Sequence, residues 1–391
     1  MVVHAYYEED PRVRREAEAV RATGRQVDVF SLRQEGDGPQ GELAGVRIHR
    51  LDVQRHQGAG IGTYLREYAA FMGRAGVALT RSHRRRRYAL VQVATIPDAL
   101  VFSALALRLA GVPVIIDLHE AMPEFFRMRF PRASGRLAHG MLVAQERLSI
   151  AFANEAITVN DALGRRLVDM GVPARKVHVV PNAPVLARFD PAAHPRRAFM
   201  EDGVLRLVYA GALSVVYELD VALEALARIR AVRPGLPFSL ELYGRDFAEQ
   251  PLHDEVAANG LGDRVQFHGR IPIDDVPAAL AAADIGLAPT RRTEFTDFSL
   301  STKIFEYAAM GKPVVASRLP MVEATFPPGT VTTYPAGDAD AMAAAILGLV
   351  DDPGAREAST ARTAELVAGL AWERVSEGYL GLVESLARDR R

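Results

Sequence analysis

The feature that most constrains the fold is an alternation of short, apolar, β-rich runs with helical patterns, which continues along most of the chain. Such alternation is typical of parallel sheets whose strands are connected by helices, so the predicted fold class is α/β. The first series of runs predicts strands over Val2–Tyr6, Gln26–Phe30, Val46–Arg50, Ala89–Ala94, Val114–Asp117, Ala156–Val159 and Val177–Val180. The second series predicts strands over Leu205–Ala210, Phe238–Tyr243, Val265–His268, Ile285–Ala288, Val314–Ala316 and Val331–Tyr334, with helices over Leu219–Val232 and Ala339–Leu349.

The stretch between the two series, from Pro181 to Gly203, is rich in proline and has no periodicity. It therefore predicts the connection between two domains. Two Rossmann-like halves imply a cleft between them, with ligands bound at the carboxyl ends of the strands. From Trp372 to Leu386 apolar residues recur at helical intervals, which predicts a C-terminal helix.

Composition excludes several classes of function. With 391 residues the chain is long enough for two domains, and its 49% hydrophobic and 24% charged residues are typical of a globular protein. A net charge of -1 provides no general attraction to nucleic acid. The absence of cysteine excludes disulfides, zinc–thiolate sites and cysteine nucleophiles, and it fits a reducing cytoplasm. Because no signal peptide or membrane-spanning run is apparent, we expect a cytoplasmic protein, either soluble or peripheral to the inner face of the membrane.

The segment SLSTKIFEYAAMGKPVVAS, residues 299 to 317, predicts a loop, a helix and a strand in succession. Lys303 falls in the first turn of the helix, where unpaired N–H groups and the helix dipole disfavour a cation unless an anion shares the site. Glu306 lies one turn later and has Lys303, not Ser or Thr, three residues before it, so the pattern is not a capping box. The residues alone leave two alternatives open, a phosphate site and an ordinary surface helix start.

Several short segments carry a resemblance when they are taken in order. They are DPRVRREAEAV (10–20), IPDALVF (96–102), DLHEAMPEFF (117–126), VVPNAP (179–184), YAGAL (209–213), VQFHGRIP (265–272) and STKIFEYAAMGKPVV (301–315). In this order they resemble the retaining glycosyltransferases of family four. The resemblance implies the GT-B fold, with two Rossmann-like β/α/β domains facing across a cleft. Residues 1–182 would bind the acceptor, residues 183–371 the nucleotide sugar, and residues 372–391 would form a helix that crosses back to the first domain.

The resemblance also implies a donor site in the second half. There Lys303 would contact the diphosphate of a UDP- or GDP-type sugar and Glu306 the ribose hydroxyls, while Ser301 and Thr302 would line the same site. A carboxylate accepts two hydroxyl protons well, and a lysine is a compact counter-charge for a phosphate. Gly211 matches the glycine that lets a loop approach the diphosphate closely.

Two further positions are implied by the same resemblance. Arg270-Ile271 lies in a loop that would pair with the nucleobase through backbone groups. His119, which follows the strand Val114–Asp117, matches the histidine that reaches the donor sugar from the first domain. A lone histidine is often structural, but the end of a buried strand is where an α/β sheet presents functional side chains. His119 and Lys303 are therefore the predicted catalytic residues.

The chain departs from the family pattern at two places. Similar enzymes carry an arginine shortly after the Gly211 loop, whereas Val215-Val216-Tyr217 contains no basic residue. They also commonly carry a glutamate eight residues before Glu306, where this chain has Phe298. Glu294 or Asp297 would then contact the sugar in its place. The candidates for the missing arginine are Arg245, Arg291 and Arg292, and the sequence does not choose among them.

The expected reaction is transfer of a hexosyl unit with retention, by a front-face displacement and without a metal ion or other cofactor. The acceptor is a glycan, a lipid-linked molecule or a small molecule. Gly58, Gly60 and Gly62 precede a helical run and form either an acceptor loop or a flexible turn. The run Arg81–Arg87 is either a solvated surface or a contact with anionic membrane. It lacks the aromatic residues that would favour single-stranded nucleic acid.

Two other classes of function remain as alternatives. One is a GT-B protein with weak or no catalysis, a nucleotide-sugar-binding protein or partner subunit, which Val216 and Phe298 favour. The other is a Rossmann oxidoreductase. Neither half opens with G-x-G-x-x-G after its first strand, which argues against the oxidoreductase.

Overall fold

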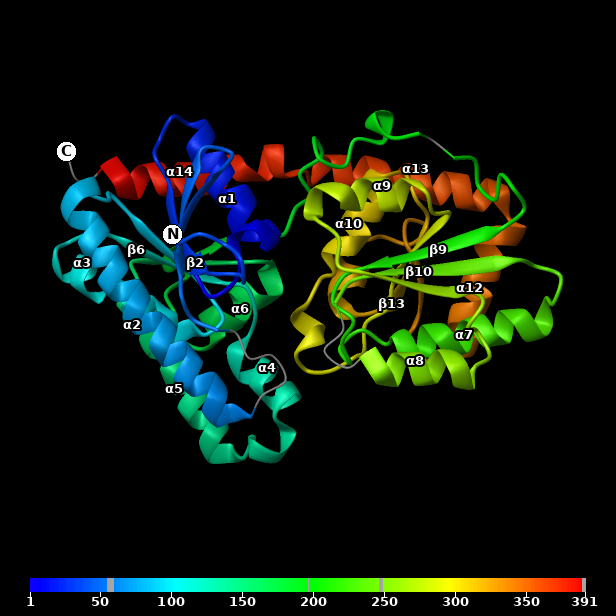
Figure 1. Ribbon diagram of the computed structural model, residues 1–391, viewed down its shortest axis with the longest axis horizontal. Coiled ribbons are helices and arrows are strands. Elements are labelled where there is room, and N and C mark those ends of the chain that lie inside the picture. Colours follow the sequence, from blue (N-terminus) through cyan, green and yellow to red (C-terminus); the bar gives the residue numbers. More distant parts are fainter. Residues whose placement is uncertain (55–59, 196, 246–248, 389–391) are drawn as a thin grey trace. The chain divides into compact units, whose positions relative to one another are not determined.

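The computed structural model describes residues 1–54, 60–195, 197–245 and 249–388. The chain forms two compact units (Figure 1). Unit 1 comprises Met1–Asn182 and Val375–Arg391, and unit 2 comprises Ala183–Arg374. Each contains a mostly parallel sheet with helices, so the expectation of two Rossmann-like α/β domains is confirmed.

Unit 1 is built on a sheet with the strand order β3-β4-β2-β1-β5-β6-β7-β8. Neighbouring strands are parallel except for β3, which pairs antiparallel with β4 at the edge. The strands are β1 Val2–Val3, β2 Asp28–Leu32, β3 Gln40–Leu43, β4 Val46–Leu51, β5 Val91–Ala94, β6 Val114–Leu118, β7 Glu155–Thr158 and β8 Val177–Val179. The α-helices are α1 Pro11–Ala22, α2 Ile61–Arg86, α3 Leu105–Leu109, α4 Met122–Arg129, α5 Arg136–Phe152, α6 Asp161–Asp169 and most of α14 Trp372–Arg388.

Unit 2 is built on an all-parallel sheet with the order β11-β10-β9-β12-β13-β14. Its strands are β9 Leu205–Ala210, β10 Phe238–Tyr243, β11 Val265–Gly269, β12 Ile285–Ala288, β13 Val314–Arg318 and β14 Thr332–Pro335. Its α-helices are α7 Leu219–Val232, α8 Glu249–Ala258, α9 Val276–Ala281, α10 Thr302–Ala309, α11 Pro320–Thr325, α12 Ala339–Asp351 and α13 Pro353–Gly369.

The periodicity of the sequence located most of these strands. β9, β10, β12 and α7 coincide with the predicted ranges, and the other predicted strands differ at their ends. Only β3 was missed among the strands of the described residues, because Gln40–Leu43 is partly exposed and contains no apolar run. An edge strand that is paired on one side needs no buried face of its own.

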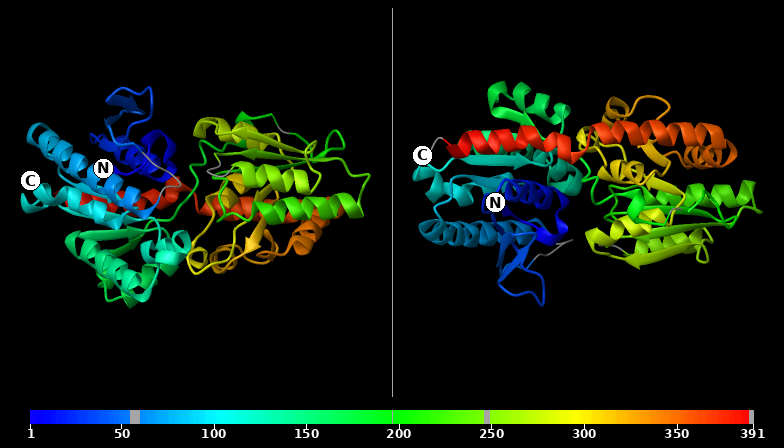
Figure 2. Two further views of the ribbon diagram at one scale, coloured as in Figure 1. Left: turned by 60° about the horizontal axis from the view of Figure 1, so that its bottom comes forward. Right: turned by 90° about the horizontal axis from the view of Figure 1, so that it is seen from above.

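Both faces of the central strands are covered by helices, which explains why their sequences are apolar throughout. In β9 Leu207 and Tyr209 belong to the apolar cluster that includes α7 and α12, whereas Val208 and Ala210 belong to the cluster that includes α10. Alternate residues of one strand therefore point into two cores. Figure 2 shows the helices on both faces of this sheet.

The last helix, α14, belongs to both units. Its first turn lies in unit 2, where the Trp372 N–H donates to the Pro184 carbonyl over 2.9 Å. The rest of the helix packs on unit 1 (Figure 2). There the Tyr379 hydroxyl donates to Gln92 over 2.7 Å, and Glu384 pairs with Arg25 at 2.5 Å. Among the described residues no helix is both long and apolar enough to cross a membrane.

Helix α10 is held against the sheet by Tyr307, which is fully buried. Its hydroxyl accepts from the Ala210 N–H over 3.2 Å and donates to the Leu287 carbonyl over 3.1 Å. The ring lies directly on Gly286 of β12, where a Cβ atom would come within 2.3 Å of ring carbons. Glycine at this position therefore sets how closely α10 approaches the sheet.

We predict that Gly286→Ala lowers the free energy of unfolding by about 1–3 kcal/mol, because the added methyl group displaces Tyr307 in a filled core. Urea denaturation monitored by circular dichroism measures the change. Gly381→Ala in α14 is the control, since nothing lies within 4 Å of its added carbon. Equal stability of Gly286→Ala and the wild type would contradict this account of how α10 is positioned.

Candidate functional site

Three glycines bring the loops at the carboxyl edge of the unit 2 sheet into direct contact. Gly211 follows β9, Gly244 follows β10 and Gly269 ends β11. The Gly211 N–H donates to the Tyr243 carbonyl over 2.8 Å, and the Gly244 N–H donates to the Gly269 carbonyl over 2.8 Å. A Cβ atom on Gly244 would lie 1.8 Å from the Gly211 carbonyl oxygen. No larger residue fits where these backbones meet.

Lys303 lies directly over the first of these loops. A Cβ atom on Gly211 would come within 2.2 Å of Lys303 Cε and 2.6 Å of its Nζ. The Nζ atom also lies 4.0 Å from the ring centre of Tyr217 and 5.0 Å from that of Tyr209. Gly211, Tyr209 and Tyr217 thus form the walls around the lysine ammonium.

The charge of Lys303 is buried without a carboxylate partner. The residue is only 7% exposed, and no described Asp or Glu lies within ion-pairing distance of its Nζ. Contact with two aromatic faces stabilises an ammonium by about 0.5–2 kcal/mol, less than the cost of removing an isolated charge from water. The arrangement therefore favours an anion that would share the site with the lysine.

The start of α10 adds neutral donors to the same place. Ser301 is the N-cap, but its side chain makes no capping hydrogen bond. Its buried Oγ has no hydrogen-bond partner among the residues that the structure describes. The N–H groups of the first helical turn, including those of Thr302 and Lys303, have no acceptor within the helix. An anion at this point would satisfy these donors together with the lysine.

The other predicted donor residues occupy the same edge of unit 2. Glu306 lies one turn after Lys303 on α10 and is half-buried. Arg270 and Ile271 directly follow Gly269, whose carbonyl accepts from Gly244. Arg270 is exposed and Ile271 half-buried. The structure therefore groups Gly211, Lys303 and the start of α10 through direct contacts, and it places the 270–271 loop beside the Gly244 turn.

The loop before α10 is fixed at its beginning. The Thr290 N–H donates to Ser317 Oγ over 2.7 Å, and the Arg291 N–H donates to the Val216 carbonyl over 2.8 Å. Glu294 on this loop is exposed, and Asp297 forms a surface ion pair with Arg292 at 3.1 Å. That Glu294 or Asp297 contacts a sugar stays a prediction.

The three candidates for the missing arginine differ in their partners. Arg291 binds both carboxylate oxygens of Asp220, and Arg292 is paired with Asp297. Arg245 forms no ion pair or side-chain hydrogen bond with any residue of the described chain. Its backbone carbonyl accepts from the Leu213 N–H over 3.2 Å, so it stands beside the Gly211 loop. Of the three, Arg245 is the arginine available to a ligand there.

A carboxylate, not a cation, is buried after the Gly211 loop. Glu218 is 0% exposed and accepts from the hydroxyls of Ser317 over 2.8 Å and Tyr334 over 3.0 Å. Burial raises the pKa of Glu218, although these hydrogen bonds oppose the shift. Because the same Ser317 hydroxyl oxygen accepts from Thr290, this network connects the Gly211 loop with the loop that leads to α10.

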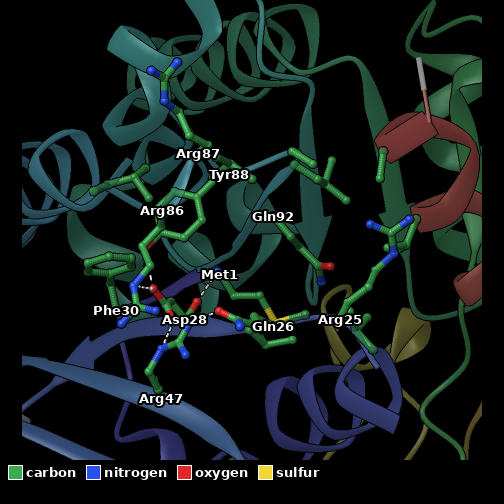
Figure 3. A pocket seen from close by; sticks show the side chains of 18 of the residues that line it. Met1, Arg25, Gln26, Asp28, Phe30, Arg47, Arg86, Arg87, Tyr88 and Gln92 are labelled. Atoms are coloured by element: carbon green, nitrogen blue, oxygen red, sulfur yellow. Dashed lines mark hydrogen bonds and ion pairs between the residues drawn. The ribbon is translucent and has the colours of Figure 1, made fainter. Parts of the chain in front are cut away.

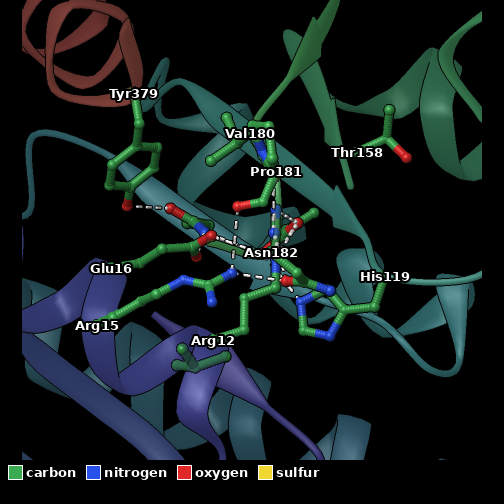
Figure 4. A network of polar contacts seen from close by, with 12 residues as sticks. Arg12, Arg15, Glu16, His119, Thr158, Val180, Pro181, Asn182 and Tyr379 are labelled. Atoms are coloured by element: carbon green, nitrogen blue, oxygen red, sulfur yellow. Dashed lines mark hydrogen bonds and ion pairs between the residues drawn. The ribbon is translucent and has the colours of Figure 1, made fainter. Parts of the chain in front are cut away.

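In unit 1 His119 follows β6 at the carboxyl edge of the sheet (Figure 4). Its Nε2 lies 2.9 Å from Asp117 Oδ2, and its side chain is 17% exposed. Burial alone would lower the pKa of His119, but the charge of Asp117 and the hydrogen bond with it raise the pKa above its ordinary value. The imidazole is thus held by a buried carboxylate at one nitrogen while its other nitrogen remains for a ligand.

The predicted acceptor loop is only partly described. Gly60 is the N-cap of α2 and Gly62 lies in its first turn, while Gly58 lies outside the described residues. The run Arg81–Arg87 forms the end of the same helix, and Arg81, Arg84, Arg85, Arg86 and Arg87 are exposed. An acceptor loop at Gly58, Gly60 and Gly62 and a membrane contact of Arg81–Arg87 stay predictions.

Unit 1 also contains a pocket of about 280 Å³ at the opposite, amino edge of its sheet (Figure 3). Asp28 and Val91, which begin β2 and β5, line it together with Arg86 and Tyr379. Asp28 inside it is already paired, with Arg47 at 2.6 Å and with the Tyr88 hydroxyl at 2.5 Å. Its carboxylate is therefore occupied, and the pocket lies away from His119.

Sequence reasoning missed the residues that surround the predicted ones. Tyr209 and Tyr217 enclose Lys303, and Arg12 binds the carboxylate that holds His119. These contacts join residues far apart in the chain, so no local spacing reveals them. The only feature of the sequence that could have pointed to Arg12 is its place in Asp10-Pro11-Arg12, a helix start within the segment DPRVRREAEAV that carries the family resemblance.

Two family models match the chain. One, described as a glycosyl transferase 4-like domain, matches residues 10–183, and one described as glycosyl transferases group 1 matches residues 205–352. A 2-deoxystreptamine glucosyltransferase of Streptomyces kanamyceticus is 26% identical over 226 residues, which are 56% of this chain and 56% of that protein. The chain thus matches just over half the length of this relative. A glycogen synthase of Mycobacterium tuberculosis is 25% identical over 92% of this chain and 86% of its own.

A solved structure extends the similarity to the whole fold. Alr3699/HepE from Anabaena, in complex with UDP and glucose, superposes with a TM-score of 0.73 and covers 98% of both chains. The sequence identity is 16%, so this likeness establishes the fold and not the substrate.

We predict that Lys303→Met raises the free energy of unfolding of the ligand-free protein by about 1 kcal/mol, because it removes a buried charge that has no carboxylate partner. Thermal denaturation without added anions measures the change. Lys312→Met is the matched control. Lys312 Nζ donates to the carbonyls of Ala281 and Ala283 over 2.8 and 2.6 Å, so its loss should destabilise the protein. Destabilisation by both substitutions would show that Lys303 already has the partner it needs.

Proposed function

We propose that this chain, a glycosyltransferase with the GT-B fold, transfers a hexosyl unit from a nucleotide diphosphate sugar to an acceptor with retention at the anomeric carbon. The observation that carries the proposal is the buried ammonium of Lys303, which lies against the rings of Tyr209 and Tyr217 in the first turn of α10 and has no described carboxylate within ion-pairing distance. A diphosphate is the ligand whose charge and size suit such a site.

The role proposed for Lys303 is to stabilise the leaving group. As the bond to the sugar breaks, negative charge grows on the β-phosphate and positive charge on the anomeric carbon. A fixed cation and helix N–H groups beside that phosphate stabilise the transition state more than the ground state. Because these groups supply positive charge, the proposed transfer needs no metal ion. Arg245 is proposed as the second cation, since it is the unpaired arginine beside the Gly211 loop.

Glu306 and His119 complete the proposed site. Glu306, half-buried one turn after Lys303, would accept hydrogen bonds from both ribose hydroxyls of a UDP- or GDP-type donor. His119 would contact the donor sugar and assist a front-face displacement. The backbone at Arg270 and Ile271 would face the nucleobase. The acceptor class stays open among glycans, lipid-linked molecules and small molecules, and the contact of Arg81–Arg87 with anionic membrane stays a prediction.

One observation favours a second candidate function. The segment after Gly211 holds a buried glutamate, Glu218, and no cation, and Phe298 replaces a polar residue of the family pattern. A GT-B protein that binds a nucleotide sugar but transfers it slowly or not at all is consistent with both. The two candidates share the donor site and differ in turnover.

The experiment that tests the proposal incubates the purified protein with UDP- and GDP-hexoses and follows release of the nucleoside diphosphate. We expect slow hydrolysis of one donor by the wild type and loss of both binding and release in Lys303→Met. Binding without release would favour the second candidate. Absence of binding to every nucleotide sugar, measured by isothermal titration, would reject both.

We predict that Glu306→Gln weakens binding of the matching ribonucleoside diphosphate about tenfold and leaves binding of its 2′-deoxy form nearly unchanged. The lost interactions are charge-assisted hydrogen bonds to the ribose hydroxyls, which the deoxy ligand makes only in part. Isothermal titration with both ligands measures the ratio. Equal losses for the two ligands would assign Glu306 a structural role instead.

A further inference from the structure

A buried cluster of charged and polar side chains lies beside His119 in unit 1 (Figure 4). Its members come from α1, β5, β6, the segment after β8, and α14. They are Arg12, Arg15, Glu16, Gln92, Asp117, Asn182 and Tyr379. Burying so many ionisable groups costs free energy unless each is paired. A functional role would explain why the chain keeps this cluster.

Arg12 is the centre of the cluster. It lies in the first turn of α1, which Asp10 caps by accepting from the N–H groups of Arg12 and Val13. Its guanidinium binds Asp117 through Nε, at 3.2 and 3.1 Å from the two oxygens, and through the NH2 group at 2.8 Å. Both groups are buried, and Asp117 is 0% exposed. This bidentate interaction fixes the plane of the Asp117 carboxylate.

Asp117 in turn holds His119. The carboxylate oxygen Oδ2 that Arg12 binds also lies 2.9 Å from His119 Nε2. An ionised carboxylate can only accept, so Nε2 carries the hydrogen and Nδ1 is the nitrogen left for a ligand. The orientation of the imidazole therefore depends on the orientation of Asp117, and that depends on Arg12.

The cluster also reaches both places where the chain passes between its units. Arg12 donates to the Val180 carbonyl over 2.8 Å, and both Arg12 and Arg15 donate to Asn182 Oδ1, over 3.0 and 2.6 Å. Asn182 is the last residue of unit 1 before unit 2 begins. On the returning helix α14, Tyr379 donates to Gln92, which donates to Glu16 over 2.7 Å and to Asp117 over 3.3 Å.

We propose that this cluster is a positioning device for His119, in which Arg12 acts through Asp117 and the two chain crossings are tied to the same carboxylate. The proposal rests on the role of His119 at the donor, and it deepens that role by naming the residue that sets the imidazole. Arg12 is thus a positioning residue and touches no substrate.

The charged groups near His119 predict the direction in which its pKa changes when each of them is removed. Asp117 favours the imidazolium form, and Arg12 disfavours it because it shares that carboxylate. The other charged groups nearby are Arg15, which faces Asp117, and Asp10, Glu16 and Glu120. Burial raises the pKa of Glu16 to about 7 and that of Glu120 to about 6, so both carboxyl groups are followed in the same titration.

The test is an NMR titration of the His119 imidazole in the ligand-free protein, with the resonance assigned by its absence in His119→Gln. Asp117→Asn removes the counter-charge while burial persists, so the pKa of His119 should fall by about one pH unit or more. Arg12→Gln removes the cation that shares the Asp117 carboxylate with His119, so the pKa of His119 should rise. Arg12→Lys keeps a cation and should return the pKa toward the wild-type value.

Arg14→Gln is the matched control. Arg14 lies two residues along the same helix, is also buried, and pairs with Glu18 at 2.8 Å. Its replacement should leave the pKa of His119 unchanged. Opposite shifts in Asp117→Asn and Arg12→Gln would support the positioning device. Unchanged values, or shifts in the same direction, would overturn it, and the isosteric Asp117→Asn keeps the test decisive if Arg12→Gln does not fold.

Because the titration needs no donor, it separates the two claims. If the expected shifts occur and no transfer is found, the cluster holds His119 but the proposed function fails. If transfer occurs without the shifts, the function stands and the positioning device fails.

Discussion

The candidate site in unit 2 is organised around the burial of one ammonium group, that of Lys303, against aromatic rings and backbone. A side chain at Gly211 would collide with Lys303. A side chain at Gly244 would collide with the backbone of the Gly211 loop. Tyr307 brings α10 close to the sheet through Gly286, and this places the lysine at the loop ends. The site is thus a group of closely packed backbone segments and rings around a charge that has no carboxylate partner among the described residues.

Unit 1 uses buried charge in the opposite way. Arg12 and Asp117 are paired with each other, and their remaining atoms are bound by Asn182, Gln92 and the Val180 carbonyl. This pairing favours a rigid cluster, because moving Arg12 or Asp117 would leave the other as a buried charge without its main partner. Unit 2 therefore buries a cation that has no described carboxylate partner, whereas unit 1 buries charges that are paired with one another.

The sequence predicted the parts of this account that local patterns encode. Alternating apolar runs located β9, β10 and β12, and the conflict between Lys303 and the helix dipole indicated an anion site. It did not reveal Tyr217 beside Lys303 or Arg12 beside Asp117, because those contacts form between elements that only the fold brings together. Arg245, Arg291 and Arg292 were equivalent in the sequence, and the ion pairs of Arg291 and Arg292 distinguish them in the structure.

The most direct test of the central claim is a crystal structure of the protein with a bound nucleoside diphosphate. The account predicts the β-phosphate within hydrogen-bond distance of Lys303 Nζ and of the N–H groups at the start of α10, above Gly211. It also predicts that the lysine keeps its place between Tyr209 and Tyr217. A diphosphate bound elsewhere, with Lys303 still enclosed by the tyrosines and without an anion, would contradict it.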